Sequence, residues 1–216
     1  MLISSEIRKK IKKIKKINKC FKNDESKSVL KKLDFNLTND QKKALDEINL
    51  DLSSKNKMFR LLQGDVGSGK TIVCLISALN VVRSGYQVAL MAPTEILAKQ
   101  HYYLAKKIFP KNIEIEILSG KTETKQRNII YEKIKNNNIN MIFGTHALFQ
   151  KKINFHNLGY IIIDEQHKFG VKQRKNLSDK GGNNCDVLLM SATPIPRTLI
   201  MSIYGDMDIS IIREKP

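Results

Sequence analysis

One eight-residue segment constrains the fold of this chain more than any other part of its sequence. Residues 58–62 are typical of a buried strand and residues 72–82 of an apolar helix, and between them lie Gly64, Asp65, Val66, Gly67, Ser68, Gly69, Lys70 and Thr71. This is the pattern G-x-x-x-x-G-K-[ST], in which glycines let backbone N–H groups surround a polyphosphate. The sequence therefore predicts a phosphate-binding loop between a strand and a helix.

The last two residues of this loop predict the cofactors. Lys70 can reach the β- and γ-phosphates of a nucleotide, and the Thr71 hydroxyl can bind Mg²⁺. Both lie where a helix begins, and a helix N-terminus favours anions. We therefore expect ATP and Mg²⁺ as ligands.

The rest of the chain alternates short apolar runs with helical windows. Strands are expected at 58–63, 87–91, 113–118, 139–143, 160–163, 187–190 and 209–212, and helices at 39–50, 70–83, 95–108, 122–135 and 195–203. This alternation predicts an α/β fold with a mostly parallel sheet and helices on both faces. Ligands bind such sheets at the carboxyl ends of the strands.

The strongest second cluster is an acidic pair after the expected strand 160–163. Asp164 can hold Mg²⁺, and Glu165 can orient or deprotonate an attacking water. Taken alone, the pair also fits a solvated turn. Together with the phosphate-binding loop it predicts a nucleotide hydrolase.

Three further clusters follow expected strands, and each has an ordinary structural explanation as well. Two of these clusters stand where helices are expected to begin, and the free N–H groups there suit the phosphates of a nucleic acid backbone. They are Pro93 with Thr94, and Gly144 with Thr145 and His146. Both threonines also suit plain helix caps. The third cluster, with Ser191 and Thr193, can link the acidic pair to another ligand or simply form a turn.

Two residues upstream of the loop suit adenine. Phe35 can stack on a base and the Gln41 amide can pair with it, although a hydrophobic staple and a surface glutamine explain them equally well. Thr38 is expected to cap the helix that starts at residue 39.

The N-terminal region carries much of the positive charge. The chain has a formal net charge of +17, and residues 1–33 contain twelve basic and three acidic residues, a net of +9. We expect a basic amphipathic helix over 5–19 and divide the chain into a helix and linker at 1–33 and an α/β domain at 34–216. The lysines either contact a polyanion such as DNA or form a solvated helix face.

Composition excludes several classes of protein. No apolar stretch is long enough to span a bilayer, and the basic N-terminus lacks the apolar region of a secretory signal. Cys20, Cys74 and Cys185 form no C-x-x-C pair, and the histidines lack metal-binding spacing. We expect a cytoplasmic protein without disulfides, a zinc site or a membrane partner.

Five motifs in this order resemble the first motor domain of superfamily 2 helicases, and within them the RecG family of bacterial ATP-dependent DNA helicases. They are GDVGSGKT, APTEILAKQH, GTHAL, DEQHKFGVKQR and SATPIPRT. The resemblance covers residues 31–216 and implies a RecA-like fold and a function in unwinding branched or forked DNA during recombination and repair. Residues 1–30 resemble more weakly the helical link from that family's wedge domain.

The resemblance also implies a role for each motif residue. Phe35 and Gln41 would contact adenine, Lys70 the phosphates, and Thr71 and Asp164 the Mg²⁺. Glu165 would be the catalytic base, with Gln166 and His167 relaying the nucleotide state. Pro93, Thr94, Gly144, Thr145 and His146 would lie near the DNA, while Ser191 and Thr193 would couple hydrolysis to motion. Lys168 stands where the family usually has arginine, which loses a planar donor group.

Helicases of this kind close the ATP site with a second motor domain that supplies arginines, and Arg197 is not expected to replace them. We therefore expect a monomeric fragment that binds nucleotide, turns it over slowly and lacks both the second motor domain and the wedge. The alternatives are the motor domain of a transcription-repair coupling translocase and a non-catalytic DNA-binding fragment.

Overall fold

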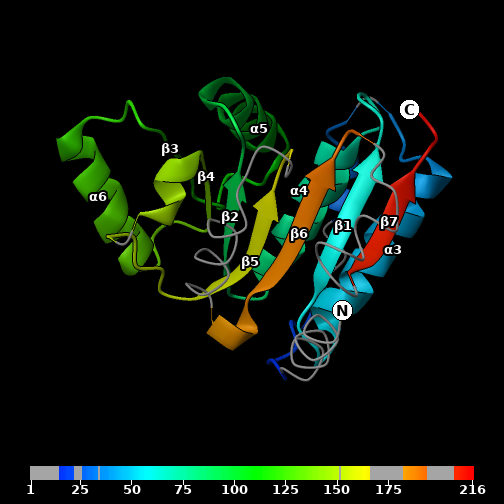
Figure 1. Cartoon of the computed structure of the whole chain (residues 1–216), viewed down its shortest axis with the longest axis horizontal. Helices are drawn as coiled ribbons and strands as arrows, with labels where there is room; N and C mark the ends of the chain where they lie inside the picture. Colours follow the sequence, from blue (N-terminus) through cyan, green and yellow to red (C-terminus); the bar gives the residue numbers. More distant parts are fainter. Residues whose placement is uncertain (1–14, 22–25, 34, 151, 166–181, 194–206) are drawn as a thin grey trace, which may run out of the picture.

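A seven-stranded parallel sheet forms the centre of the protein (Figure 1). The structure is a computed structural model that describes residues 15–21, 26–33, 35–150, 152–165, 182–193 and 207–216. The strands are β1 (Phe59–Gly64), β2 (Gln87–Met91), β3 (Ile115–Leu118), β4 (Met141–Gly144), β5 (Leu158–Ile163), β6 (Asp186–Ser191) and β7 (Asp208–Ile212). Their order is β3-β4-β2-β5-β6-β1-β7, and each neighbouring pair is parallel.

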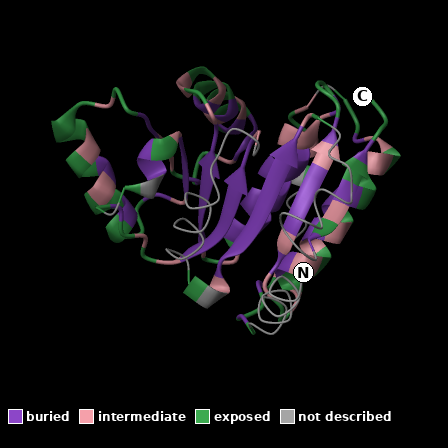
Figure 2. Ribbon diagram, in the orientation of Figure 1, coloured by how far each residue is buried: buried purple, intermediate pink, exposed green. Residues whose placement is uncertain are grey.

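Helices cover both faces of this sheet. They are α2 (Ser26–Leu30), α3 (Asn39–Ser53), α4 (Lys70–Arg83), α5 (Glu95–Ile108) and α6 (Thr124–Lys135), with short 3-10 turns η1 (His146–Phe149) and η3 (Gly182–Asn184). Residues of α3, α4 and α5 share one apolar cluster with the sheet, and residues of α6 and η1 share another. Strands β2, β4, β5 and β6 are buried throughout, whereas the edge strands β3 and β7 are partly exposed (Figure 2).

Neighbouring residues of the central strands face opposite clusters. Leu61 lies in the α6 cluster and Leu62 in the α4 cluster, and Ala89 and Leu90 divide in the same way. All four are fully buried. This explains why these strands read as continuous apolar runs, since a parallel sheet must satisfy an apolar layer on each face.

The predicted fold class is confirmed, and most elements lie where the sequence placed them. The helices predicted at 70–83 and 95–108 have the predicted bounds. The helix predicted at 39–50 continues to Ser53, and the strand predicted from residue 113 begins at Ile115. The helix predicted at 195–203 lies outside the described residues.

The basic N-terminal helix predicted over 5–19 does not continue to residue 19. Residues 1–14 lie outside the described part, Lys15 forms an isolated antiparallel bridge with Asn56, and residues 16–21 carry no helix. This segment is instead held by the domain, because the Lys16 N–H donates to the Lys55 carbonyl at 2.8 Å. Side-chain contacts of Lys16 and Lys19 with the start of β6 supply the physical reason.

Candidate nucleotide and nucleic acid site

The candidate residues gather at one edge of the sheet. All strand arrows in Figure 1 point to the same edge, and the segments after β1, β2, β4, β5 and β6 contain the predicted functional residues. Backbone hydrogen bonds join these segments: Ala92 donates to the Gly144 carbonyl at 2.9 Å, and Asp164 donates to the Met91 carbonyl at 2.8 Å. The edge is therefore one connected site, as expected for a parallel sheet.

The phosphate-binding loop runs from Gly64, the last residue of β1, to Lys70, the first residue of α4. Gly67 and Gly69 both have φ of 82°, a left-handed conformation that favours glycine. Gly69 precedes α4 and offers no side-chain cap, so the first two N–H groups of the helix, those of Lys70 and Thr71, are not capped by it and suit an anion. The Ser68 hydroxyl is buried and has no hydrogen-bond partner among the described residues. An orphan polar group beside such N–H groups fits a bound phosphate.

Lys70 lies across this loop. Its ammonium group donates to the carbonyls of Gly64 at 2.6 Å and Asp65 at 2.8 Å. Partial burial lowers the pKa of Lys70 below its usual value, while the nearby carboxylates of Asp164, Glu165 and Asp65 oppose that shift. The acidic pair and the loop lysine therefore lie close enough to interact electrostatically. Thr71 follows in the first turn of α4.

Gln41 holds the loop from the side of α3. Its side-chain oxygen accepts from the Thr38 N–H at 3.0 Å, and its side-chain nitrogen donates to the Ser68 carbonyl at 2.9 Å. The residue is fully buried and completes a capping box with Thr38, which confirms the predicted cap. Both polar atoms of the amide are thus engaged within the protein. Phe35 is exposed, and contact of either residue with adenine stays a prediction.

The acidic pair ends β5. The side chain of Asp164 is largely buried and its Oδ2 atom lies 2.8 Å from Nε2 of His101. Glu165 adopts a positive φ of 49°, an uncommon conformation outside glycine that costs of the order of 1–3 kcal/mol. Such local strain is frequent at functional sites. Gln166, His167 and Lys168 lie outside the described residues.

The two segments predicted to face nucleic acid lie side by side. Thr94 caps α5 by accepting from the Leu97 N–H at 3.3 Å, so its cap function is real, and its side chain remains exposed. Thr145 precedes η1 without a side-chain cap bond. Gly144 is required by close packing, because a Cβ atom there would lie 2.4 Å from the Leu118 carbonyl oxygen. Contact of Pro93, Thr94, Gly144, Thr145 and His146 with DNA stays a prediction.

The segment after β6 forms an internally bonded turn. The Ser191 hydroxyl is buried and lies 3.1 Å from the Thr193 carbonyl oxygen and 3.2 Å from the Thr193 hydroxyl. Since β6 pairs with β1, Ser191 stands beside Gln63, next to the start of the phosphate-binding loop. The turn therefore lies next to the strand that leads into the phosphate-binding loop. Arg197 lies outside the described residues.

A match between the sequence and a protein-family model shows which family this chain belongs to. The family described as DEAD/DEAH box helicase matches residues 38–201, well over half of the 216 residues. The chain belongs to the DEAD/DEAH box helicase family.

Individual relatives of this DEAD/DEAH box domain are longer proteins. It is 55% identical over 189 residues to the ATP-dependent DNA helicase RecG of Aquifex aeolicus, which covers 87% of this chain and 24% of that protein. RecG of Borreliella burgdorferi is 50% identical over 200 residues, covering 90% of this chain and 29% of that protein. The chain thus spans only 24–29% of the length of these curated relatives, and the predicted resemblance to RecG is confirmed.

Similar folds are found among solved structures of helicases. The structure of RecG bound to a three-way DNA junction superposes with a TM-score of 0.85 and 42% identity, over 100% of this chain and 29% of that chain. The DEAD-box helicase Mss116 bound to single-stranded RNA and UDP-BeF gives a TM-score of 0.68 with 21% identity, over 88% of this chain and 43% of that chain. The second match supports the fold alone.

Reasoning from the sequence did not identify three residues of this chain whose contacts the structure shows. His101 contacts the acidic pair, and Lys16 and Lys19 contact Asp186 at the opposite edge of the sheet. His101 could have been found as the one polar residue on an otherwise apolar helix face, whereas the lysines were hidden in a basic run.

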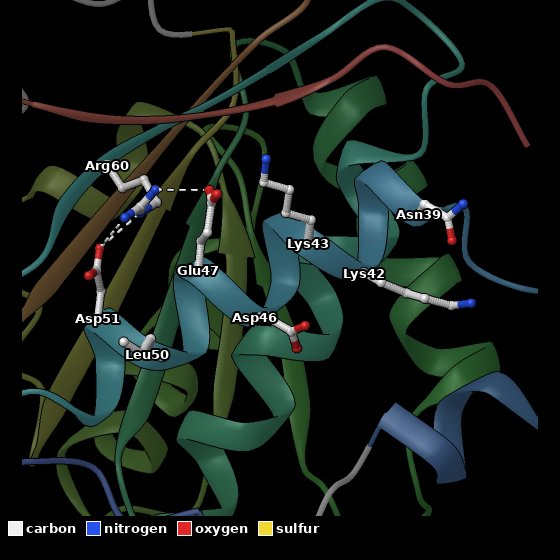
Figure 3. Close-up of a pocket in the computed structure, with 8 residues that line it drawn as sticks. All are labelled: Asn39, Lys42, Lys43, Asp46, Glu47, Leu50, Asp51 and Arg60. Carbon is white, nitrogen blue, oxygen red and sulfur yellow. Dashed lines mark hydrogen bonds and ion pairs between the residues drawn. The ribbon is translucent and has the colours of Figure 1, made fainter.

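A concave region lies along α3, away from the candidate site. It is an open groove of about 580 Å³, shown in Figure 3, where the Arg60 guanidinium reaches Glu47 and Asp51. Arg60 bonds Asp51 at 2.8 Å, Glu47 at 3.3 Å and the Ser210 hydroxyl at 2.8 Å. The arginine is buried and ties α3 to β1 and β7, so this network has a structural role.

Three other features are absent from the described residues: a metal-binding cluster, a membrane-spanning helix and paired cysteines. This described part of the chain contains no group of three or more histidine, cysteine, aspartate or glutamate side chains that could hold a metal ion. None of its helices combines the length and apolar character needed to cross a membrane. Cys20, Cys74 and Cys185 are all free thiols.

Proposed function

We propose that this chain is the ATP-binding motor domain of a RecG-type DNA helicase that acts on branched DNA in recombination and repair. The observation that carries the proposal is the joining of four segments at one edge of the sheet. The phosphate-binding loop, the acidic pair and the two loops at Thr94 and Thr145 share backbone or electrostatic contacts. Sequence identity to RecG helicases supports DNA as the substrate.

The proposed chemistry follows from the positions of the side chains. The N–H groups of the loop and Lys70 would hold the phosphates of ATP, and Thr71 and Asp164 would hold Mg²⁺. When held by these two residues, Mg²⁺ would supply neutralisation of the negative charge on the phosphates. Glu165 would orient the attacking water and accept its proton. Gln166 and His167 would relay the nucleotide state.

Movement of DNA would require the two outer loops and the turn after β6. Thr94 is exposed at the N-terminus of α5, which suits a backbone phosphate. Ser191 and Thr193 would couple hydrolysis to motion because their turn abuts the strand that enters the phosphate-binding loop. We further propose a cytoplasmic location, a monomeric state and the division into a basic segment at 1–33 and a motor domain at 34–216.

The buried lysines bear on the alternatives. A DNA-binding fragment that works through its lysine-rich N-terminus needs accessible ammonium groups, but Lys16 and Lys19 are buried against Asp186. The identity to RecG helicases favours that family over the transcription-repair coupling translocase. Both observations support the helicase proposal.

Nucleotide binding measured by calorimetry, together with phosphate release in the presence and absence of a three-way junction, tests the proposal. We expect the 216 residues to bind ATP with Mg²⁺ and to release phosphate slowly, because the resemblance to superfamily 2 helicases implies that arginines of a second motor domain complete this site. Lys70→Ala should abolish binding. Absence of ATP binding by the folded wild-type chain would refute the proposed function, and rapid DNA-stimulated turnover would refute the need for a second domain.

A further inference from the structure

A histidine contacts the first residue of the acidic pair. His101 belongs to α5 and Asp164 ends β5, and Nε2 of the ring lies 2.8 Å from Oδ2 of the carboxylate. Only 8% of the histidine side chain and 11% of the aspartate side chain are exposed. The contact is therefore largely screened from solvent and joins a helix to the end of a strand.

The position of His101 on its helix is unusual for a polar residue. The buried face of α5 consists of Ala98, His101, Ala105 and Ile108, spaced at helical intervals. A polar group among such residues costs free energy unless it is hydrogen-bonded. The imidazole meets this requirement through Asp164.

The hydrogen bond restricts the carboxylate. The Asp164 N–H is already fixed by the Met91 carbonyl at 2.8 Å, so the backbone is held on one side and the side chain on the other. His101 engages Oδ2, which restrains rotation of the carboxylate and leaves Oδ1 outside this contact. Carboxylates that bind metals are commonly oriented by such a partner, and loss of the partner typically costs about 10–100-fold in metal affinity.

We propose that His101 is a positioning residue that orients Asp164 for Mg²⁺ and ties this carboxylate to α5. The proposal rests on the proposed function, in which Asp164 is a Mg²⁺ ligand of the ATP site. It adds that the affinity for the cation depends on a residue that touches neither nucleotide nor metal.

The test measures Mg²⁺ dependence rather than turnover. A fluorescent ATP analogue is titrated onto the 216-residue chain in EDTA and then at rising Mg²⁺ concentration. For His101→Ala we expect unchanged affinity in EDTA and a Mg²⁺ midpoint raised by about 10–100-fold. His101→Gln should restore most of the loss, because its amide nitrogen can donate to Oδ2. His156→Ala, which removes an exposed histidine, is the matched control.

Each outcome decides a separate point. A wild-type Mg²⁺ midpoint in folded His101→Ala would overturn the inference, as would an equal loss of affinity with and without Mg²⁺, which would indicate a purely structural role. Should His101→Ala fail to fold, the shorter amide of His101→Asn replaces it under the same criteria. Wild-type binding that is indifferent to Mg²⁺ would refute the inference and leave nucleotide binding intact, whereas no binding at all would refute the proposed function.

Discussion

The ammonium group of Lys16 lies 2.6 Å from the carboxylate of Asp186, and both side chains are completely buried. Lys19 contacts the same carboxylate, which also accepts from the Met58 N–H at 2.7 Å. Lys16 donates further to the carbonyls of Asp51 and Leu52. Burial lowers the pKa of Lys16, and the attraction of Asp186 opposes that shift. One aspartate thus holds the N-terminal segment 15–21 against the domain.

Replacement of this aspartate should strongly destabilise the fold. Asp186→Ala would leave two buried ammonium groups without their shared partner, and breaking a buried pair typically costs about 3–5 kcal/mol. Urea unfolding monitored by circular dichroism measures the change. The matched control is Asp208→Ala, because Asp208 also begins a parallel strand but is exposed. Equal stability of the two variants would contradict the account.

Alanine variants of two glycines in the phosphate-binding loop distinguish the effect of backbone strain from that of a steric clash. Gly67 and Gly69 share a φ of 82°, but a Cβ atom on Gly69 would lie 2.3 Å from the Gln41 amide nitrogen, whereas one on Gly67 meets nothing within 4 Å. Alanine at either position incurs strain of about 1–2 kcal/mol. We expect Gly69→Ala to cost more and to displace Gln41 from the Ser68 carbonyl. Thermal unfolding and nucleotide affinity should therefore fall further for Gly69→Ala than for Gly67→Ala, and the reverse order would refute the role of Gln41.

The start of α3 should contribute to stability in a pH-dependent manner. Asp40 accepts hydrogen bonds from the N–H groups of Arg213 and Glu214, and these bonds lower its pKa below 3.8. Because the carboxylate is favoured in the folded state, its contribution is present above the unfolded pKa of 3.8 and is lost as the pH falls through the lower folded pKa. Asp40→Asn should therefore flatten the acid limb of stability measured between about pH 5 and pH 2. An unchanged acid limb would show that these bonds do not persist in solution.

Arg60, which lines the α3 groove, should contribute more to the stability of the fold than an exposed arginine does. Arg60→Ala removes contacts with Asp51, Glu47 and Ser210, and the two carboxylates are about one-third exposed, so water compensates part of the loss. We expect destabilisation of about 1–3 kcal/mol in chemical unfolding. Arg83→Ala is the control, since Arg83 is exposed. A loss no larger than that of the control would refute a structural role for the groove network.

Sequence periodicity predicted the parts of the fold that depend on local pattern. Helices α4 and α5 have their expected bounds. The residue before each helix, Gly69 or Thr94, marks its start, and the apolar spacing predicts how far it extends. Strand β3 is shorter than expected because Ile113 is buried outside the ladder. The helix predicted over 5–19 was wrong at its C-terminal end, since Lys16 and Lys19 contact a carboxylate that lies 170 and 167 residues away in sequence.

The candidate site was predictable in outline for the same reason. Its motifs are contiguous and follow strands, so Lys70 and Asp164 could be assigned to one edge of the sheet. The contacts that orient them could not, because the bond between His101 and Asp164 joins residues 63 positions apart. Gln41 was assigned to adenine, although Thr38 and Gln41 also carry the spacing of a capping box.

Strand β6 begins at the buried Asp186 and ends at Ser191, beside the phosphate-binding loop. Its six residues span roughly 20 Å and are hydrogen-bonded on both sides, to β5 and to β1. The segment at Lys16 is thereby joined to the neighbourhood of the phosphate-binding loop through a single strand, from Asp186 at one end to Ser191 at the other.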